Sequence, residues 1–393
     1  MIFGLIKDTK KDENRTICTP TEIRAIVAAG HTALVQSGAG IGANFSDEAY
    51  ARAGATVVDS AREIFARSDL VAKVKEIEPS EYKYLRKDQI IYCCIHPAGH
   101  PEEVDAILRS KCIAITAEDS HRYGSPNCEA AGKQGALFGL ESMLTINGGK
   151  GKLVGGLAGA PRMKVLILGG GTVGQAALGV LYALGADVTV MDVNIGVLKA
   201  LLDRYENRIS TAYCTRDNIA ELLPNTDMVI NCVRWPKERR DFLIDKEMLK
   251  GMERGSVLVD ISNDNPGAIE SSHETHHDNP RYVVNGVVHY CVSNIPGAVA
   301  HSTSVALAAE TLPLLLNILN NGVIEASVRD GFIRRALTAY KGYLTHEETS
   351  IVQRRPWIRP EDILGISGRE LDPAPPLTST RSSHFYSIDD IKL

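Results

Sequence analysis

Short apolar runs alternate with amphipathic stretches along the first third of the chain. Apolar runs of about four to six residues bounded by Gly, Pro or polar residues are typical of buried strands, whereas apolar positions three and four apart are typical of helices. The pattern predicts strands at 2–6, 31–36, 55–58, 70–74, 90–95 and 113–116. It predicts helices between them at 21–29, 47–53, 61–66 and 101–108. Alternation of this kind indicates an α/β domain with its own parallel sheet.

A second series of apolar runs begins near residue 163. It predicts strands at 165–168, 187–191, 228–233, 257–261 and 287–292 and helices at 127–146, 195–205 and 299–319. The helices at 127–146 and 299–319 are expected to carry the chain into a second domain and back again. We therefore predict an α/β protein with two doubly wound parallel-sheet (Rossmann-like) domains, linked by long helices around a cleft. One domain comprises residues 1–127 and 300–345, the other comprises residues 128–299, and residues 346–393 form a C-terminal extension.

A glycine-rich turn joins the strand at 165–168 to the following helix, in the pattern GxGxxG. The first glycine of this pattern permits a tight turn, the second lets the backbone approach a pyrophosphate, and the third lets the helix pack closely on the strand. The free N–H groups and the dipole of the helix then face the phosphates. We predict that residues 128–299 bind a dinucleotide, which contacts Gly169, Gly171, Thr172, Val173 and Gly174.

Asp192 ends the next predicted strand, 18 residues after Gly174. A carboxylate in this place accepts hydrogen bonds from the ribose hydroxyls of an adenosine and repels a 2′-phosphate. Val193 and Asn194, which follow, carry no positive charge that could neutralise such a phosphate. The sequence therefore predicts NAD as the cofactor, rather than NADP.

Composition narrows the class of protein further. Hydrophobic residues make up 44% and charged residues 23%, and the net charge is −5 without a long single-sign block, which argues against nucleic acid or an anionic membrane as a partner. Only six residues precede Lys7, and no run approaches about 18 apolar residues, so we expect neither a secretory leader nor a membrane span. Eight cysteines lie scattered without CxxC spacing, as buried free thiols do. These features indicate a cytoplasmic protein.

Four polar residues follow apolar runs, at the ends of strands where a sheet presents side chains to a ligand: Arg15, Lys75, His96 and Asp264. Each alone has a plainer interpretation, as a surface charge, a satisfied strand-end histidine or a turn residue. Their joint appearance on two domains with a dinucleotide fingerprint makes them candidates for chemistry.

These residues and their surroundings also carry a family resemblance. The segments Glu13-Asn-Arg15, Lys73-Val-Lys75-Glu76, Val259 to Asp264 and Asn285 to Ala298, together with His96 and GxGxxG, resemble the alanine dehydrogenase and transhydrogenase N-terminal family over residues 1 to about 340. The resemblance implies an NAD-dependent amino-acid dehydrogenase, which we expect to be a homo-oligomer acting on a small molecule.

Residue roles follow from the resemblance. It implies that Arg15 and Lys75 hold the substrate carboxylate and carbonyl, that His96 is the acid/base, and that Asp264 orients substrate or water beside the nicotinamide. It also implies that Asn294 borders the cofactor, and we place Val233 in the same site. Such residue types suit a 2-oxo acid, because its carboxylate and its carbonyl oxygen each need a cation while an imine needs a proton donor working near pH 7.

The loop after residue 231 departs from a simple alanine dehydrogenase pattern. It reads Asn231-Cys-Val-Arg234-Trp235-Pro236-Lys237-Glu-Arg239-Arg240 and looks more like saccharopine dehydrogenases, which join an amino acid to a 2-oxo acid. Four cations and an indole predict a second carboxylate or a larger substrate bound by Arg234, with alanine a poor substrate. The alternative is a solvated loop or subunit contact.

Three functions therefore stay open. They are an alanine dehydrogenase-like enzyme, an opine-type dehydrogenase of the saccharopine or N5-(carboxyethyl)ornithine synthase kind, and a non-catalytic NAD-binding transhydrogenase-like subunit. The presence of both His96 and Asp264 argues against the last. His273-Glu-Thr-His-His277 matches the zinc motif HExxH, but its polar, proline-bounded setting predicts a loop and no metal site.

Overall fold

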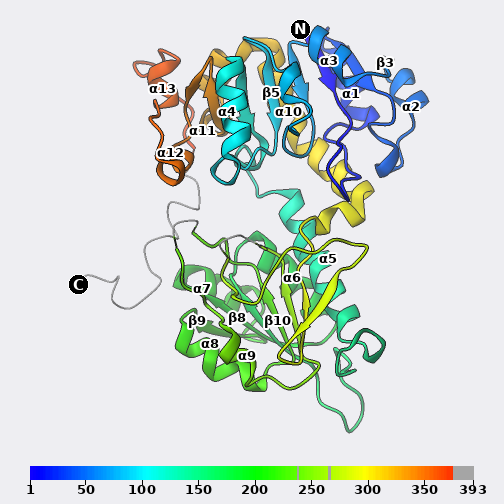
Figure 1. The fold of residues 1–393 in the computed structure, drawn as a ribbon, viewed down its shortest axis with the longest axis vertical. Coiled ribbons are helices and arrows are strands. Elements are labelled where there is room, and N and C mark those ends of the chain that lie inside the picture. The colour runs from blue at the N-terminus through cyan, green and yellow to red at the C-terminus, as the bar shows by residue number, and fades with distance from the viewer. Residues whose placement is uncertain (237–238, 264–266, 375–393) are drawn as a thin grey trace. The chain divides into compact units, whose positions relative to one another are not determined.

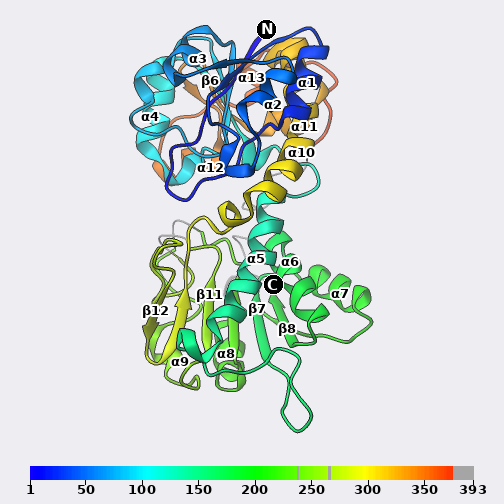
Figure 2. The same ribbon diagram turned by 90° about the vertical axis from the view of Figure 1, so that its right-hand side faces the viewer.

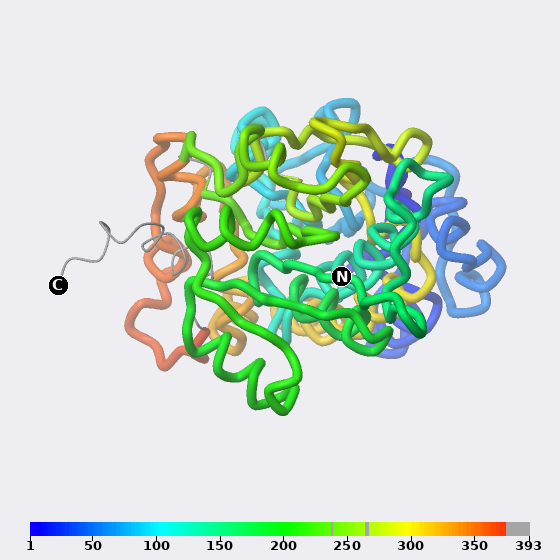
Figure 3. The backbone as a smooth tube through the Cα atoms, turned by 90° about the horizontal axis from the view of Figure 1, so that it is seen from below, coloured from blue at the N-terminus to red at the C-terminus, as the bar shows by residue number. Residues whose placement is uncertain are grey.

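The computed structural model describes residues 1–236, 239–263 and 267–374, and these fall into two compact units (Figure 1). Unit 1 contains residues 1–126 and 297–374, and unit 2 contains residues 127–296. The backbone can be followed through both units, from blue to red, in Figure 3.

Unit 1 is built on one eight-stranded sheet. Its strands are β1 (Ile2–Leu5), β2 (Thr32–Gln36), β3 (Thr56–Val58), β4 (Leu70–Ala72), β5 (Ile90–Cys93), β6 (Ile113–Thr116), β14 (Leu337–Tyr340) and β15 (Tyr343–Leu344). The order is β15-β14-β6-β5-β4-β1-β2-β3, so the chain reverses its direction of winding between β1 and β4. The strands β1 to β6 pair in parallel, as predicted, whereas β14 and β15, which were not predicted from the sequence, pair antiparallel at one edge.

The helices of unit 1 are α1 (Pro20–Ala28), α2 (Asp47–Arg52), α3 (Ala61–Arg67), α4 (Pro101–Ser110), α10 (Ala300–Arg329), α11 (Gly331–Arg335), α12 (Glu347–Gln353) and α13 (Pro360–Ile363). Apolar side chains alternate between the two faces of the sheet, because successive strand residues point in opposite directions. Ala33 and Val35 of β2 belong to one core cluster, and Leu34 belongs to another. Both faces of the sheet are therefore buried, which accounts for the continuous apolar runs in the sequence.

Helix α10 is longer than the predicted helix at 299–319. An 18-residue window has a mean hydropathy of 1.4, which by length and composition would suffice to cross a membrane. Half of that window is buried, and Leu307, Leu315 and Ile318 belong to the core of unit 1. The apolar composition of α10 is thus explained by packing in the core. The helix also contains a kink at Gly322, where φ is 73°.

Unit 2 has a seven-stranded sheet. Its strands are β7 (Lys164–Leu168), β8 (Asp187–Asp192), β9 (Ser210–Tyr213), β10 (Met228–Asn231), β11 (Val257–Asp260), β12 (Arg281–Val284) and β13 (Val287–Tyr290). The order is β12-β13-β11-β10-β7-β8-β9, and the direction of winding reverses between β7 and β10. Only β12 among these strands is antiparallel; it pairs with β13 in a hairpin whose turn residues, Asn285 and Gly286, both have positive φ.

The helices of unit 2 are α5 (Pro126–Ser142), which begins at the unit boundary, α6 (Thr172–Ala183), α7 (Ile195–Arg204), α8 (Arg216–Leu222) and α9 (Lys246–Leu249) (Figure 2). Glycines let α5 pack closely on its neighbours. A Cβ at Gly132 would lie 2.1 Å from the carbonyl oxygen of Val173 in α6, and one at Gly139 would lie 2.6 Å from the sulfur of Met228 in β10. The Ala- and Gly-rich composition of α5 is therefore a requirement of its packing.

Candidate active site

The polar residues of unit 1 follow four neighbouring parallel strands, in the sheet order β6-β5-β4-β1. Asp8 follows β1, Lys75 follows β4, His96 follows β5 and Glu118 follows β6. The carboxyl ends of adjacent parallel strands meet at one edge of a sheet, where α/β proteins bind their ligands. The sheet therefore gathers these four side chains.

Arg15 lies in the loop after β1 and is buried, with 4% of its surface exposed. Its Nε donates to Oε1 of Glu13 at 2.8 Å and its Nη2 to Oε2 at 2.5 Å, and its backbone N–H also donates to Oε1. Burial opposes ionisation of Glu13, but the Arg15 guanidinium outweighs it and lowers the pKa of Glu13. A two-pronged ion pair thus fixes the orientation of the Arg15 guanidinium.

Asp8 fixes the backbone that presents Lys75. Its Oδ2 accepts from the N–H groups of Val74 at 2.9 Å and Lys75 at 3.1 Å. The fully buried Lys73 lies 3.4 Å from Oδ1 of Asp8 and 2.9 Å from Glu81. Burial raises the pKa of Asp8 to about 6, against the opposing effect of Lys73. Lys75 itself is half-buried at the edge of the sheet.

His96 has an unusual backbone for a non-glycine residue, with φ 48° and ψ 51°. Its N–H donates to Oε1 of Glu118 at 2.6 Å, and its ring Nδ1 lies 3.3 Å from the same oxygen. A left-handed residue followed by proline costs about 1–3 kcal/mol and persists only where the surroundings hold it. Glu118 is the group that holds it, and the His96 side chain stays 47% exposed.

The three predicted residues of unit 1 act on shared neighbouring groups. Burial opposes ionisation of Glu76, but Lys75, His96 and Lys10 lower its pKa to about 2. Lys75 and Arg15 both act on the buried thiol of Cys94, whose pKa burial raises. Asp264, the fourth predicted residue, lies outside the described residues.

The fingerprint turn of unit 2 has the geometry that each glycine was expected to provide. Gly169 has φ 92°, which favours glycine. A Cβ at Gly174 would lie 1.9 Å from the carbonyl oxygen of Gly169, whereas one at Gly171 would meet no atom of the described residues within 4 Å. Gly171 therefore leaves open space in front of the N-terminus of α6, next to the exposed Thr172 and the half-buried Val173.

Asp192 lies at the end of β8, beside this turn. Its Oδ2 accepts from the N–H of Gly170 at 2.7 Å and its Oδ1 from the N–H of Asn194 at 2.8 Å. Val233, in the loop after β10, lies on the other side of the turn, because a Cβ at Gly169 would come 3.4 Å from its Cγ2. These residues surround the point between β7 and β10 where the winding reverses, which is where doubly wound sheets bind nucleotides.

Asn294 is buried, with 2% of its surface exposed, and its carbonyl oxygen lies 3.2 Å from Nε2 of His277. His277 belongs to the HExxH segment, which contains no helix, so the loop prediction is confirmed. Among the described residues, no three His, Cys, Asp or Glu side chains are grouped so as to hold a metal ion.

Comparison with known proteins decides the family. Two domain descriptions match the chain, "Alanine dehydrogenase/PNT, N-terminal domain" over residues 4–126 and "Alanine dehydrogenase/PNT, C-terminal domain" over residues 136–347. The chain belongs to the alanine dehydrogenase/PNT family. The resemblance read from the sequence is thereby confirmed, and so is an alanine dehydrogenase-like oxidoreductase.

Relatives of this family match nearly the whole chain. An alanine dehydrogenase of Methanococcus maripaludis is 36% identical over 371 residues, which are 93% of this chain and 100% of the relative. One of Bacillus subtilis is 37% identical over 354 residues, 88% of this chain and 93% of the relative. A solved L-alanine dehydrogenase superimposes with a TM-score of 0.83 at 35% identity, covering 90% of this chain and 99% of the other, which confirms the two-domain α/β fold.

The structure of the loop after β10 differs from the prediction that its side chains bind a larger substrate. Trp235 was expected to shape a substrate pocket, but it is 1% exposed and belongs to the hydrophobic core of unit 2. The guanidinium of Arg239 lies 4.7 Å from the centre of the indole ring and pairs with Asp241. Arg234 is exposed, and Lys237 lies outside the described residues. The indole therefore stabilises the loop and is not available to a substrate.

The supporting carboxylates Asp8, Glu13 and Glu118 were not predicted from the sequence. Glu118 could have been, because it follows an apolar run that neighbours the run ending at His96, as the carboxyl-end rule requires. Asp8 stands in the same relation to β1. Glu13 carries no comparable signal, since it lies in an irregular loop.

Proposed function

We propose that this protein is an NAD-dependent alanine dehydrogenase. It would convert L-alanine, NAD⁺ and water into pyruvate, ammonium, NADH and a proton. The observation that carries the proposal is the grouping of Arg15, Lys75 and His96 at one sheet edge, in a chain that matches alanine dehydrogenases over nearly its whole length.

The glycine turn of unit 2 suits NAD(H). Gly171 leaves room for a pyrophosphate, the first turn of α6 offers its N–H groups, and Asp192 is held where a ribose would lie. In this proposal Gly169, Gly171, Thr172, Val173 and Gly174 hold the pyrophosphate, Asp192 holds the ribose, and Val233 and Asn294 border the cofactor. When bound, NAD⁺ supplies the hydride acceptor, and the protein orients the cofactor and the substrate toward each other.

Arg15 and Lys75 would hold the substrate. The Arg15 guanidinium, held from behind by Glu13, binds the carboxylate that alanine and pyruvate share. Lys75 lies close enough to Glu76 to lower its pKa and offers an ammonium to the substrate oxygen. Negative charge that develops on the carbonyl oxygen of pyruvate when ammonia attacks the carbonyl carbon is stabilised by that ammonium.

His96 would move the protons. Its Nδ1 faces Glu118, so Nε2 is the nitrogen turned to the substrate. As a base, it takes a proton from the water that attacks the imino acid, and as an acid it gives that proton to the departing nitrogen, which leaves as ammonium. Asp264 is proposed to orient this water, on the basis of its place in the sequence pattern that resembles the family.

A substrate panel tests the proposal. NADH oxidation is measured with pyruvate and larger 2-oxo acids, each with ammonium or with the amines of lysine and ornithine, and repeated with NADPH. Pyruvate with ammonium and NADH should give the highest kcat/KM, because Asp192 repels a 2′-phosphate and Trp235 adds nothing to the substrate pocket. A higher value with an amino-acid amine would indicate an opine-type enzyme, and no turnover with any pair would indicate a non-catalytic NAD-binding subunit.

We also propose that the protein works as a cytoplasmic homo-oligomer. Several exposed apolar side chains lie close together in the sequence of unit 2, at Leu144, Ile146, Leu153 and Leu157. Apolar groups in one exposed segment are typical of a protein interface. Light scattering after size-exclusion chromatography should give a multiple of 42.6 kDa, and a single monomer peak at micromolar concentration would contradict it.

A further inference from the structure

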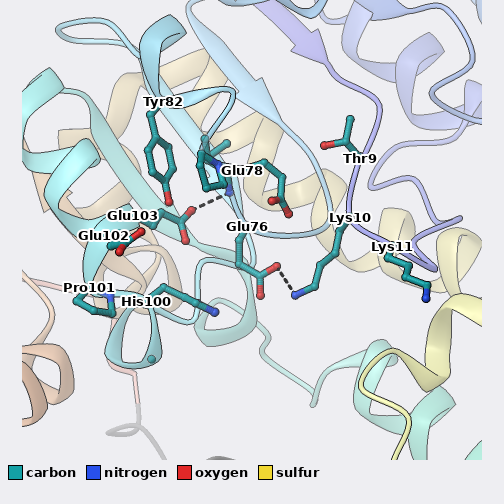
Figure 4. A pocket seen from close by; sticks show the side chains of 13 residues that line it. Thr9, Lys10, Lys11, Glu76, Glu78, Tyr82, His100, Pro101, Glu102 and Glu103 are labelled. Atoms are coloured by element: carbon teal, nitrogen blue, oxygen red, sulfur yellow. Dashed lines mark hydrogen bonds and ion pairs between the residues drawn. The ribbon is translucent and has the colours of Figure 1, made fainter. Parts of the chain in front are cut away.

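Arg15 lies in the loop of residues 6–19, which joins β1 to α1. The ion pair with Glu13 orients its guanidinium, but both residues belong to this loop, so the pair moves with the loop and cannot fix its place. The loop is held near its start, where Lys10 pairs with Glu76 at 3.0 Å beside a cavity of about 580 Å³ (Figure 4). The segment that carries Arg15 lies further along the loop and needs anchors of its own.

Ser304, near the start of α10, is one such anchor. The backbone N–H of Thr16, the residue after Arg15, donates to the Ser304 hydroxyl oxygen at 2.9 Å. Thr16 and Ser304 are both buried, so this acceptor is shielded from water. Buried N–H groups are almost always paired, because an unpaired one is costly. The core helix α10 therefore fixes the backbone on the C-terminal side of Arg15.

Gly42 is a second anchor, on the N-terminal side of Arg15. It is the central residue of the 3₁₀ turn η1 (Ile41–Ala43). A Cβ at Gly42 would lie 2.7 Å from the carbonyl oxygen and 2.8 Å from the Cα of Asn14, which is closer than a side-chain carbon can approach backbone atoms. The φ of Gly42 is not positive, so the close approach, and not the backbone conformation, requires glycine here.

The turn η1 is itself fixed to α10. The ring Nδ1 of His301 donates to the carbonyl oxygen of Ala43 at 2.8 Å, and the ring stacks on Phe45 with 5.1 Å between the ring centres. His301 and Ser304 lie three residues apart on α10 and so share one face of the helix. The same helix face therefore holds both η1 and the Arg15 loop. An added Cβ at Gly42 would displace the irregular loop at Asn14 rather than this anchored turn.

We propose that Ser304 and Gly42 are positioning residues for Arg15, and that they hold the backbone of residues 14–16 where the Arg15 guanidinium meets the substrate carboxylate. The inference rests on the proposed dehydrogenase function. Neither residue touches the substrate in this proposal. The substrate carboxylate does not react, so Arg15 binds it equally before and during the reaction. Loss of its position should therefore weaken substrate binding more than it slows the chemical step.

Steady-state kinetics in the reductive direction test both residues. Ser304→Ala removes the acceptor of the Thr16 N–H group, and Gly42→Ala adds the obstructing Cβ. Each variant should raise KM for pyruvate about tenfold, keep kcat within about twofold of wild type and leave the Kd for NADH unchanged. A residue needed only for folding would lower the amount of active enzyme, and with it the apparent kcat, without changing KM.

Two matched variants serve as controls. Ser327→Ala changes another buried serine of α10, whose hydroxyl has no hydrogen-bond partner among the described residues. Gly368→Ala adds a Cβ that meets no described atom within 4 Å. Both should keep the wild-type KM for pyruvate. An unchanged KM in folded Ser304→Ala or Gly42→Ala would refute the positioning role of that residue, and if Gly42→Ala does not fold, Ser304→Ala decides the test.

Direct binding separates this proposal from the proposed function. Saturation-transfer NMR, with NADH present and ammonium absent, should detect pyruvate on the wild type and both controls, with a weaker signal on Ser304→Ala and Gly42→Ala. A protein that shows this pattern but never oxidises NADH with pyruvate and ammonium would refute the dehydrogenase function and keep the positioning role. An equal signal on the wild type and Ser304→Ala, or no signal on the wild type, would refute the positioning role.

Discussion

Each polar side chain proposed to contact the substrate is held by a carboxylate one layer behind it. Glu13 accepts hydrogen bonds from the Arg15 guanidinium. Asp8 accepts from the backbone N–H of Lys75, and Glu118 accepts from the backbone N–H of His96. These contacts restrict each of the three residues before a substrate arrives, which lowers the entropy lost on binding. The left-handed backbone of His96 costs folding free energy, and strain of this kind is concentrated at functional sites.

Replacing His96 tests its proposed role most simply. His96→Ala should lower kcat by a factor of about 10²–10⁴ while leaving the Kd for NADH unchanged, because the proton transfer is lost and the cofactor contacts are not. Stopped-flow NADH oxidation and fluorescence titration give the two values. Normal turnover in the variant would mean that His96 is a strand-end residue without a catalytic role.

Glu103 predicts a pH dependence of stability. Its pKa is raised from 4.5 to about 9, so the folded state holds this proton more tightly than the unfolded chain does. This contribution to the free energy of unfolding is fully present below about pH 4.5 and is lost as pH rises through about 9. Glu103→Gln carries no titrating proton. The difference in Tm between this variant and the wild type should therefore increase by a few degrees from pH 5 to pH 9. A constant difference over that range would contradict the raised pKa of Glu103.

At the scale of elements, close packing of glycine explains both the cofactor turn and α5. In α6, Gly174 contacts the first residue of the turn, whereas a Cβ at Gly179 would lie 3.9 Å from the hydroxyl oxygen of Tyr205. The same substitution should therefore have opposite consequences at two positions of one helix.

Gly174→Ala should raise the Kd for NADH at least about tenfold, because a Cβ 1.9 Å from the Gly169 oxygen must displace the turn. Gly179→Ala should leave the Kd unchanged and stabilise the helix by up to about 1 kcal/mol. Fluorescence titration of NADH measures both variants, with circular dichroism to check folding. Equal affinity in the two variants would show that the turn does not bind the cofactor in the expected way.

Hydrophobic patterning was sufficient to predict the elements that have two buried faces. The runs at 165–168 and 113–116 became β7 and β6 nearly unchanged. Edge strands could not be predicted in this way. The edge strand β9 (Ser210–Tyr213) is mostly half-buried and contains no apolar run. The antiparallel β12 could have been found from Asn285-Gly286, which favours a hairpin turn.

The candidate site was less predictable than the sheets. Arg15, Lys75 and His96 were predicted because polar residues at the ends of parallel strands meet at one edge of a sheet. Trp235 belongs to the same core cluster as residues distant in sequence, such as Leu258, and no local pattern contains that information. Burial of an indole in a loop is decided by tertiary packing, and the sequence alone gave the wrong role for it.

At the scale of the whole molecule, the proposed reaction requires one chain to bind alanine through unit 1 and NAD⁺ through unit 2. A hydride must then pass from alanine to NAD⁺. The most direct test uses L-alanine carrying deuterium on its α-carbon, with mass spectrometry of the NADH that forms. The account predicts that one deuterium per turnover appears in NADH, with pyruvate and ammonium formed in equal amounts. NADH that forms without deuterium, or no NADH at all from alanine, would contradict it.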